Sequence, residues 1–328
     1  MGTVLGVDGG ASKTHALVAD ESGRILGYGK AGPANHQTRG LAPAMAEVER
    51  AARAAIECGE LSGTPVEVGC FCLGGADLPE DYAMLQKAVE ALQLVQKTII
   101  KNDTMAALRA GLTRSWGVVV ICGTGFNAAG RAPDGREIIL PGLGPISGDW
   151  GGGGTLSQEM IRMVMRAWDG RGKPTLLTEM VLEALGVPSV EILLSKLYHD
   201  EIGQRRLLGL VPLLFEAAET GDEASRNLIV QMGTEVGVTA NALIRRLSMG
   251  NRDVEVILGG GVFKGKGSLL FDTVKRVVSK EAPKARVVRL HREPVMGAVL
   301  LALESTGEVA GEEIQRALEC SLPAELTM

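Results

Sequence analysis

The sequence contains one strand–turn–strand pattern twice, and this repeat constrains the fold more than any other feature. Residues 4–26 read VLGVDGGASKTHALVADESGRIL, and residues 118–140 read VVVICGTGFNAAGRAPDGREIIL. In each copy an apolar strand runs into a glycine-rich turn, a second strand, a polar turn and a third strand. Two copies of one unit predict two homologous halves that face each other, each with its own glycine hairpin.

The first glycine turn carries residues that suit a phosphate. It is not a Walker A loop, because Ser12 stands before Lys13 and because a strand, THALVA, follows instead of a helix. Backbone N–H groups of a tight turn can still hold phosphate. Asp8 would then suit Mg²⁺, which binds few carboxylates and keeps several waters. Taken alone, an ordinary Asp-Gly hairpin explains these residues equally well.

Length and charge exclude several classes of protein. A chain of 328 residues predicts two domains, and a formal net charge of −5 gives no basic footprint for nucleic acid. No apolar run reaches membrane length, and no signal-peptide pattern opens the chain, so we expect a cytoplasmic protein without a membrane partner. Among the five cysteines, Cys70 and Cys72 lie on a predicted strand, where buried thiols are expected rather than a metal or redox site.

The remaining chain alternates helical and strand patterns, which is typical of α/β domains with mixed sheets. A long helical region, about 154–249, follows the second repeat, and sheet elements return afterwards. The predicted helices cover 41–59, 78–94, 104–112, 268–280, 294–305 and 311–322, and the predicted strands cover 66–73, 97–101, 254–258 and 285–290.

Eight short motifs follow one another along the chain. They are GVDGGASKT (6–14), ANHQ (34–37), LGGAD (73–77), KNDTMAAL (101–108), GTGFNAAG (123–130), GPISGDWGGGG (144–154), LGGGVF (258–263) and PVMGAVLLA (294–302). In this order they resemble the motifs of the actin-like ATPase superfamily. The chain is most similar to the N-acetylglucosamine kinase branch of the BadF/BadG ATPase family.

The resemblance implies an α/β fold of two actin-like (ribonuclease H-like) domains. Each domain would be a mixed five-stranded sheet flanked by helices, with a cleft between them. We expect an N-terminal domain of residues 1–115 plus 308–328 and a C-terminal domain of residues 116–307. The last helix, about 310–321, should pack on the first half, and closure should occur about hinges near 114–117 and 305–311.

The resemblance also implies ATP and Mg²⁺ as cofactors and a set of ligand-binding positions. Asp103 would be the catalytic base and Asp8 would hold Mg²⁺ through water. Phosphates and adenosine would contact Gly9, Gly10, Ser12, Lys13, Gly123, Thr124, Gly125, Gly259, Gly260 and Gly261. The sugar would contact Asn35, Gly74, Asp103, Thr124 and Asp149.

The residues themselves give independent reasons for some of these roles. Asp103 follows the strand KTIIK and precedes a helix, so it could be a base at a strand end or simply the N-cap of that helix. Asn35 suits sugar hydroxyls better than His36, which could be a surface residue. Asp149 could bind a sugar hydroxyl or only close a glycine-rich turn. Lys264 and Lys266 could be a solvated face.

Three positions depart from the family pattern around the proposed sugar pocket. Trp150 stands where the family usually has glutamate, Phe126 where it often has serine, and Gln37 where the expected kinase has an aromatic residue. These departures leave the choice of sugar open.

We therefore expect a homodimeric kinase that transfers the γ-phosphoryl group of ATP to a hydroxyl of an amino sugar such as N-acetylglucosamine. Two alternatives remain. The first is the family's other branch, the ATPase activators of 2-hydroxyacyl-CoA dehydratases, which hold an iron–sulfur cluster through cysteines in a dimer seam. The second is a non-catalytic sugar sensor, although a repressor would carry an added DNA-binding module, which we do not expect in a chain that opens on the hairpin.

Overall fold

The computed structural model describes residues 2–63, 65–307 and 310–326, which form two compact units. The first unit takes the chain up to residue 119, residues 129–139 and the chain from residue 290 onward; the second takes residues 120–128 and 140–289. The domain limits expected from the repeat, 1–115 with 308–328 and 116–307, stay a prediction. Residues 308 and 309, within the predicted hinge 305–311, lie outside the described residues.

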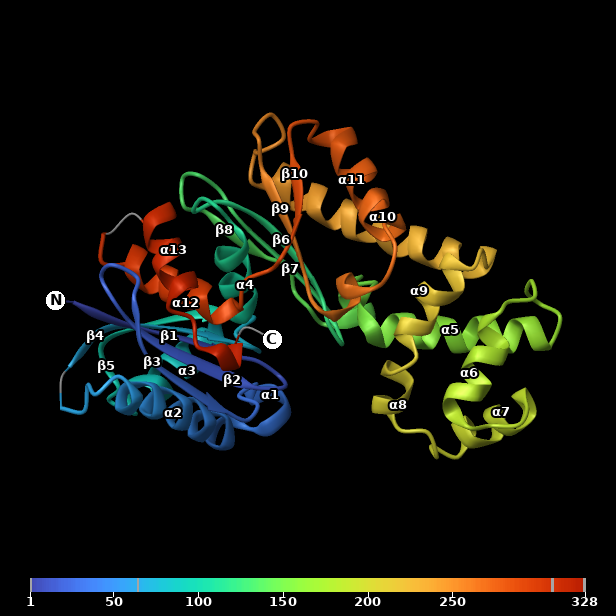
Figure 1. Cartoon of the computed structure of the whole chain (residues 1–328), viewed down its shortest axis with the longest axis horizontal. Helices are drawn as coiled ribbons and strands as arrows, with labels where there is room; N and C mark the ends of the chain where they lie inside the picture. The colour runs from blue at the N-terminus through green and yellow to red at the C-terminus, as the bar shows by residue number, and fades with distance from the viewer. Residues whose placement is uncertain (1, 64, 308–309, 327–328) are drawn as a thin grey trace. The chain divides into compact units, whose positions relative to one another are not determined.

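The first sheet is mixed and has the strand order β3-β2-β1-β4-β5 (Figure 1). Strands β1, β2 and β3 form an antiparallel meander, and β4 and β5 then run parallel to β1. The bounds are β1 Thr3–Gly9, β2 Thr14–Asp20, β3 Ile25–Ala31, β4 Val66–Leu73 and β5 Val95–Asn102.

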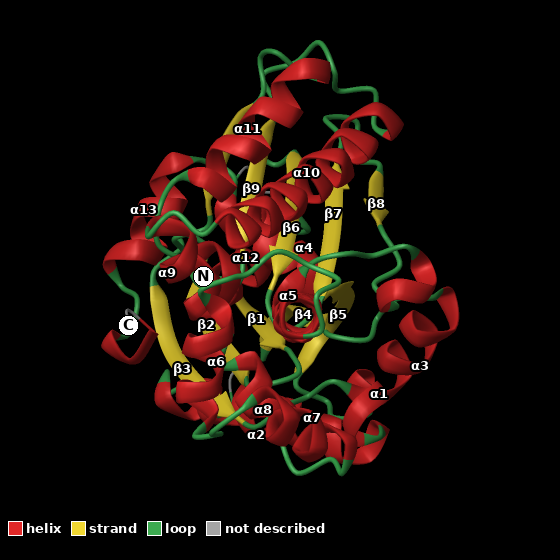
Figure 2. Cartoon of the chain, turned by 90° about the vertical axis from the view of Figure 1, so that its right-hand side faces the viewer, coloured by secondary structure: helices red, strands yellow, loops and turns green. Residues whose placement is uncertain are grey.

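The second sheet has the order β10-β9-β6-β7-β8, which repeats the first when it is read from β8, and β9, β6, β7 and β8 run side by side in Figure 2. The first strand of the second copy, β6, is the central strand of this sheet, as β1 is in the first sheet, and its hairpin partner β7 lies beside it. The predicted duplication is therefore confirmed at the level of strand order. The bounds are β6 Gly117–Cys122, β7 Phe126–Arg131, β8 Glu137–Ile139, β9 Glu255–Gly259 and β10 Arg286–Arg289.

Helices cover both faces of the first sheet. Alanines of α2 pack on Leu5, Val7, Ala16 and Val18 of the meander, whereas α12 covers the opposite face (Figure 1). The helix α13 packs on the β2–β3 turn, as predicted, where Ser321 Oγ accepts a hydrogen bond from Ile25 N at 2.9 Å. The bounds are α1 His36–Arg39, α2 Leu41–Cys58, α3 Pro79–Glu90, α4 Asp103–Gly111, α12 Pro294–Glu304, α13 Glu312–Cys320 and η3 Ala324–Leu326.

The second unit contains the long helical region that the sequence predicted. Its longest helix, α10, packs along α11, where Gly233 and Gly237 meet the side chains of Thr273 and Val277. None of the helices described is long and apolar enough to span a membrane. The bounds are η1 Gly144–Ser147, α5 Gly152–Trp168, α6 Leu177–Leu185, α7 Val190–Tyr198, α8 Gln204–Leu208, α9 Val211–Glu219, α10 Glu223–Arg246, η2 Gly261–Lys264 and α11 Leu269–Glu281.

Helix α12 approaches both β1 and α4 at backbone distance, and two glycines make this possible. A Cβ on Gly6 of β1 would lie 2.6 Å from Val299 Cγ2 and 2.9 Å from the carbonyl carbon of Ala298. A Cβ on Gly297 would overlap the carbonyl oxygen of Ala106 and lie 2.6 Å from Ala110 N. The α12 backbone is thus held against the strand that contains Asp8 and the helix that begins at Asp103.

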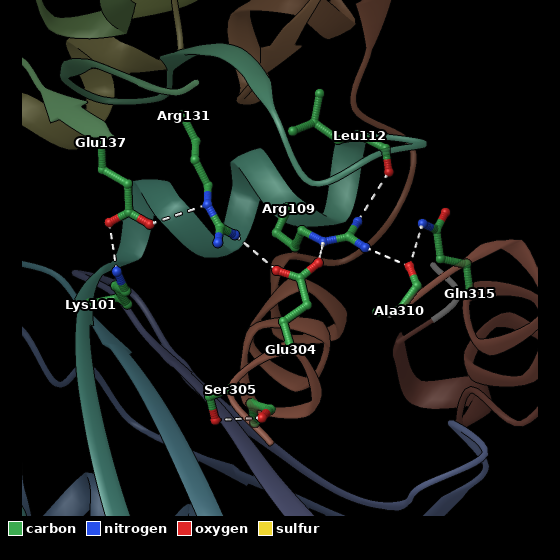
Figure 3. A network of polar contacts seen from close by, with 10 residues as sticks. Lys101, Arg109, Leu112, Arg131, Glu137, Glu304, Ser305, Ala310 and Gln315 are labelled. Carbon is green, nitrogen blue, oxygen red and sulfur yellow. Dashed lines mark hydrogen bonds and ion pairs between the residues drawn. The ribbon is translucent and has the colours of Figure 1, made fainter. Parts of the chain in front are cut away.

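A partly buried charge network fastens the segment 129–139 to the rest of the first unit (Figure 3). Glu304, at the end of α12, accepts from Arg109 Nε at 2.7 Å and from Arg131 Nη1 at 2.8 Å. Arg131 also pairs with Glu137, which in turn accepts from Lys101 Nζ at 2.6 Å. The four elements α12, α4, β7–β8 and β5 are therefore joined through two carboxylates.

Arg109 is the most deeply buried member of this network, with a side chain only 2% exposed. Besides Glu304, its guanidinium donates to the carbonyl oxygens of Leu112 at 3.3 Å and Ala310 at 2.8 Å. Burial lowers the pKa of Arg109, and the Glu304 carboxylate opposes that shift. A buried cation is tolerated here because each edge of the guanidinium has a hydrogen-bond acceptor.

We expect Gly297→Ala to destabilise the protein strongly, because the new methyl group must displace the α4 backbone. Overpacking of a tight core contact typically costs about 1–3 kcal/mol or more. Thermal or urea unfolding would measure the loss. Gly203→Ala is the matched control, since a Cβ there meets nothing within 4 Å, and it should leave the midpoint nearly unchanged. Equal midpoints for the two variants would contradict the packing argument.

Candidate active site

The first glycine turn joins two strands, as the sequence predicted, and is anchored to its neighbours by backbone hydrogen bonds. Gly10 N donates to Lys13 O at 3.0 Å inside the turn. Outside it, Gly74 N donates to Gly9 O at 2.8 Å and Ala34 N donates to Gly10 O at 3.0 Å. The phosphate-binding candidates Ser12 and Lys13 are exposed at its tip.

Four predicted site residues of the first unit come together at the ends of β1, β4 and β5. A Cβ on Gly74 would lie 3.1 Å from Asp103 Oδ2 and 3.2 Å from Asn35 Nδ2, and a Cβ on Gly10 would lie 3.9 Å from the same Asp103 oxygen. The absence of side chains on these glycines keeps the Asp103 carboxylate open on two sides. The sequence placed these residues in four separate motifs, and the topology makes them neighbours.

Asp103 is the first residue of α4, and it is not the N-cap of that helix. The cap is Asn102, whose side-chain oxygen accepts from Thr104 N at 2.9 Å. The Asn102 amide also donates to Asp77 Oδ1 at 2.9 Å and Ala76 O at 3.2 Å. The capping role that the sequence left open for Asp103 therefore belongs to its neighbour.

The electrostatic setting of Asp103 and Asp8 favours protonation of both carboxyls. Burial raises the pKa of Asp103 to about 6, with a further contribution from the charge of Asp77. Burial, together with the charge of the neighbouring Asp103, raises the pKa of Asp8 to about 8, while Lys13 acts in the opposite direction. Buried carboxyls whose pKa is raised by a neighbouring carboxylate are a common feature of sites that bind a cation or move a proton.

These carboxyls fit a Mg²⁺ ion in number and in kind. Oxygen ligands suit Mg²⁺, which usually takes one or two carboxylates, substrate phosphates and several waters rather than a full protein cage. Within the described ranges no group of three or more His, Cys, Asp or Glu side chains could hold a metal. Asp8, a buried carboxyl beside Asp103, fits the protein ligand of such a partly hydrated cation.

The motif that precedes α2 is tied to the loop after β4. Asn35 is the N-cap of α1 and accepts from Gln37 N at 2.9 Å, which leaves its Nδ2 directed to Gly74. Gln37 Nε2 donates to Asp77 Oδ2 at 3.0 Å. Gln37, one of the residues that depart from the family pattern, thus connects the segment 34–37 to the loop 73–77, the two segments that were predicted to contact the sugar.

His36 is not the surface residue that the sequence suggested. Its side chain is 9% exposed, and its Nε2 lies 3.4 Å from Asp81 Oδ1 of α3. The imidazole packs on Gly75, where φ is +88° and a Cβ would lie 2.9 Å from the ring. His36 therefore holds the segment 34–37 against α3 and the loop after β4.

The second glycine turn is built on backbone contacts in the second unit. Gly123 N donates to Gly125 O at 3.1 Å, and the N–H groups that open α5 return to this turn, with Gly153 donating to Gly123 O at 2.7 Å and Gly154 to Thr124 O at 2.9 Å. Thr124 and Gly125 are exposed. A Cβ on Gly260, where φ is +102°, would overlap the Cys122 carbonyl, so the predicted adenosine glycines reach the same turn.

Asp149 already has local partners in the glycine-rich loop. Its Oδ2 accepts from Gly144 N at 3.0 Å and from Ser147 Oγ at 2.7 Å, so this carboxylate closes the turn that contains η1. Phe126, one of the departures, packs its ring on Gly151, where a Cβ would lie 2.7 Å from Cδ2. Both observations indicate that the loop around Trp150 is shaped locally by these two residues.

A cavity of about 210 Å³ lies beside the glycine run 259–261 in the second unit. Its walls are apolar side chains of α9 and η2, and the Lys266–Glu216 ion pair at 3.6 Å lies at its rim. The lining residues are Val211, Pro212, Phe215, Glu216, Gly261, Val262, Lys264, Gly265 and Lys266. An apolar slot of this kind suits the flat face of a nucleobase.

Sequence reasoning missed several residues that shape the site. Glu293 precedes α12 and lies 3.5 Å from Lys13 Nζ, although 280 residues separate them. Asp77 modulates Asp103, and Phe215 lines the apolar cavity from α9. Asp77 was inside a recognised motif, LGGAD, but nothing in the sequence indicated that Glu293 would lie beside Lys13 or that Phe215 would line the cavity of the second unit.

Proteins of similar sequence are sugar kinases by name. The chain is 29% identical over 303 residues to an N-acetylmuramic acid/N-acetylglucosamine kinase of Clostridium acetobutylicum, which covers 91% of this chain and 97% of that protein. It is 31% identical over 314 residues to an N-acetyl-D-glucosamine kinase of Dictyostelium discoideum, covering 92% and 98%.

Solved structures of similar fold extend the comparison. A protein from Chromobacterium violaceum, solved as a candidate N-acetylglucosamine kinase, superposes with a TM-score of 0.67 at 22% identity and covers 92% of this chain and 99% of its own. A ROK family glucokinase from Streptomyces griseus, in complex with glucose and AMPPNP, gives a TM-score of 0.54 at 21% identity, covering 92% and 100%. At such identities the likeness shows a shared fold.

A family model describes nearly the whole chain. It matches residues 5–302, which include both glycine hairpins, the helical region and most of α12. The chain belongs to the BadF/BadG/BcrA/BcrD ATPase family.

Proposed function

We propose that the protein is an ATP-dependent kinase that transfers the γ-phosphoryl group to a hydroxyl of an amino sugar, with N-acetylglucosamine as the first candidate. The observation that carries this proposal is the open Asp103 carboxylate beside Gly10, Gly74 and Asn35. The two similar proteins named N-acetylglucosamine kinases support the choice of sugar.

Asp103 has the properties of a general base for this reaction. It would accept the proton of the sugar hydroxyl while that oxygen bonds to the γ-phosphorus and the bond from phosphorus to the bridging oxygen of ADP breaks. A pKa near 6 leaves Asp103 mostly ionised at neutral pH and still basic enough to take a proton. Asn102 holds the start of α4, so the carboxylate is free of the capping role.

The remaining residues position charge. The backbone N–H groups of the turns at Gly9–Lys13 and Gly123–Gly125 are suited to phosphate oxygens, and Lys13 adds a cationic side chain. Asp8 would hold Mg²⁺, which when bound supplies neutralisation of the phosphate charge. The adenine would lie in the apolar cavity lined by Val211 and Phe215.

Sugar contacts would come from Asn35, Gly74, Thr124 and Asp149. Asn35 Nδ2 is a donor directed to the Asp103 side of the loop. Because Asp149 Oδ2 is used inside its own loop, its other oxygen is the candidate for a sugar hydroxyl. A homodimer and a cytoplasmic location stay predictions from the sequence.

The dehydratase-activator alternative is less well supported. Cys70 and Cys72 are buried on β4 with their sulfur atoms 3.8 Å apart, and Cys122 is buried in β6. Burial raises the pKa of the Cys72 and Cys122 thiols, whereas cluster ligands are thiolates. Only Cys58 and Cys320 are exposed.

A coupled assay of ADP release tests the proposed activity directly. We expect turnover with N-acetylglucosamine to exceed that with glucose, glucosamine, N-acetylmannosamine and N-acetylmuramic acid. Equal and slow ADP release with and without every sugar, together with a visible iron–sulfur spectrum after anaerobic purification, would support the activator alternative.

Asp103→Asn should lower kcat by about two to four orders of magnitude, because an amide cannot take the hydroxyl proton. Its melting temperature and its ATP affinity should stay near those of the parent, since Asn102 caps α4. Calorimetry and steady-state kinetics would measure these quantities. Asp149→Asn is the comparison, and it should mainly raise KM. Turnover of Asp103→Asn near the parental rate would exclude Asp103 as the base.

The pH dependence of kcat/KM should show an acidic limb with an apparent pKa near 6, which reports ionisation of Asp103 in the free enzyme. Activity should fall as pH drops through this value, because the protonated carboxyl is not a base. Asp77→Asn removes a neighbouring negative charge and should move the limb to lower pH. A limb that stays in place would show that another group controls it.

The metal-free protein should lose stability as pH rises from about 4 to about 8. Asp8 has its pKa raised from 3.8 to about 8 in the folded state, so its proton stabilises that state most fully at low pH and is lost through pH 8. Asp8→Asn should flatten this slope in a series of melting curves. Added Mg²⁺ with nucleotide should restore stability at pH 8 in the parent but not in the variant.

A further inference from the structure

His15 of β2 is a buried polar residue for which the proposed mechanism has no use. His15 is only 3% exposed, yet neither Nδ1 nor Nε2 has a hydrogen-bond partner among the described residues. A buried imidazole needs one acceptor and one donor partner in its neutral form. Leaving both nitrogens unpaired is costly, so such a group usually indicates a bound water or ligand.

Strand register places His15 next to the predicted cation ligand. In the antiparallel pair of β1 and β2, His15 is directly opposite Asp8, so the two side chains lie on the same face of the sheet. Cys72 of β4 occupies the other side of Asp8 on that face. The same face is covered by α12, whose residues Ala298 and Val299 meet Gly6 two positions before Asp8.

Packing alone does not explain an imidazole at this position. Its aromatic neighbour is Tyr28, whose ring meets His15 edge-on with 6.0 Å between centroids, and the Tyr28 hydroxyl is itself without a hydrogen-bond partner in the described chain. A phenyl or aliphatic side chain would make the same contact without burying two unpaired nitrogens. Packing therefore leaves the two nitrogens of His15 unexplained, and the register places Asp8 of β1 on one side of this residue and Lys30 of β3 on the other.

We propose that His15 is a positioning residue for the divalent cation at Asp8, whose imidazole accepts a hydrogen bond from a water that hydrates the cation. The inference rests on the proposed function, because it assumes a cation at Asp8. Mg²⁺ keeps several of its waters, and groups that orient the ligands of a metal tune its affinity even though they do not touch it. In this arrangement His15 gains the partner that it lacks.

Binding of Mn²⁺, measured by electron paramagnetic resonance of the free ion, tests the proposal without relying on turnover. The full chain would be titrated in the presence of a non-hydrolysable ATP analogue. His15→Leu and His15→Phe both remove the nitrogens, and Phe keeps the edge contact with Tyr28. Each should weaken Mn²⁺ binding by about tenfold or more. Neither should lower the melting temperature much, because an unpaired buried polar group is removed.

Two further variants make the outcomes distinct. Tyr28→Phe removes the neighbouring unpaired hydroxyl and should leave Mn²⁺ affinity unchanged; a loss equal to that of His15→Leu would overturn the proposal in favour of general packing. Asp8→Asn should abolish the binding of Mn²⁺ at this site. If Asp8→Asn has no effect, the cation site itself is wrong. If Asp8→Asn abolishes binding while both His15 variants bind Mn²⁺ like the parent, only the role of His15 is excluded.

Enzyme kinetics give a second readout that a purely structural role would not move. In the His15 variants the KM for Mg²⁺ should rise by a similar factor, while kcat at saturating Mg²⁺ should stay close to that of the parent. A fall in kcat at saturating Mg²⁺ with unchanged KM for Mg²⁺ would contradict a role in holding the cation.

Discussion

The contact of α12 with β1 and α4 is the constraint on which the catalytic geometry depends. Gly6 and Gly297 let three backbones meet without side chains between them. Because Asp8 lies on β1 and Asp103 is the first residue of α4, this contact fixes the two elements that carry these carboxyls. Closely packed backbone leaves little room for either element to shift, which is what a site for phosphoryl transfer needs when positioning supplies most of the catalysis.

Around this contact, charged groups are held by short-range partners rather than by solvent. Asp77 binds the Asn102 amide and Gln37 while its charge raises the pKa of Asp103. Glu304 joins Arg109 and Arg131 at the other end of α12. The same helix therefore packs on the elements that carry Asp8 and Asp103 and joins the charge network at Glu304, so its position is fixed at both ends.

Much of the fold could be predicted from sequence because the repeat is long and its strand pattern is clear. The order of the strands followed from two copies of one meander with helices after them. His36 was misjudged because its partner, Asp81, lies on a helix that no local pattern links to it. The role of Asp103 was ambiguous because Asn and Asp cap helices about equally well. Only the hydrogen bond from Thr104 N to the Asn102 side chain, seen in the structure, shows that Asn102 is the N-cap and Asp103 is not.

The parts of the site that sequence could not predict depend on contacts between distant segments. Glu293 meets Lys13 across 280 residues, and Phe215 reaches the apolar cavity from a helical region without a recognised motif. The register between strands also cannot be read from a single sequence. Only the observed pairing of β1 with β2 shows that His15 is opposite Asp8. Sequence motifs identify the loops that carry candidate functional residues. The topology of the sheet decides which side chains from different loops lie next to one another.

The duplicated hairpins have equal topology but unequal chemistry. Counted from the strand starts Thr3 and Gly117, the position of Asp8 in the first copy is that of Cys122 in the second, and this thiol is fully buried. One copy thus places an ionisable carboxyl before its glycine turn, and the other places a small apolar group there. The two halves therefore share a strand order but differ in the group that precedes the glycine turn, so only the first copy offers a carboxylate at this position.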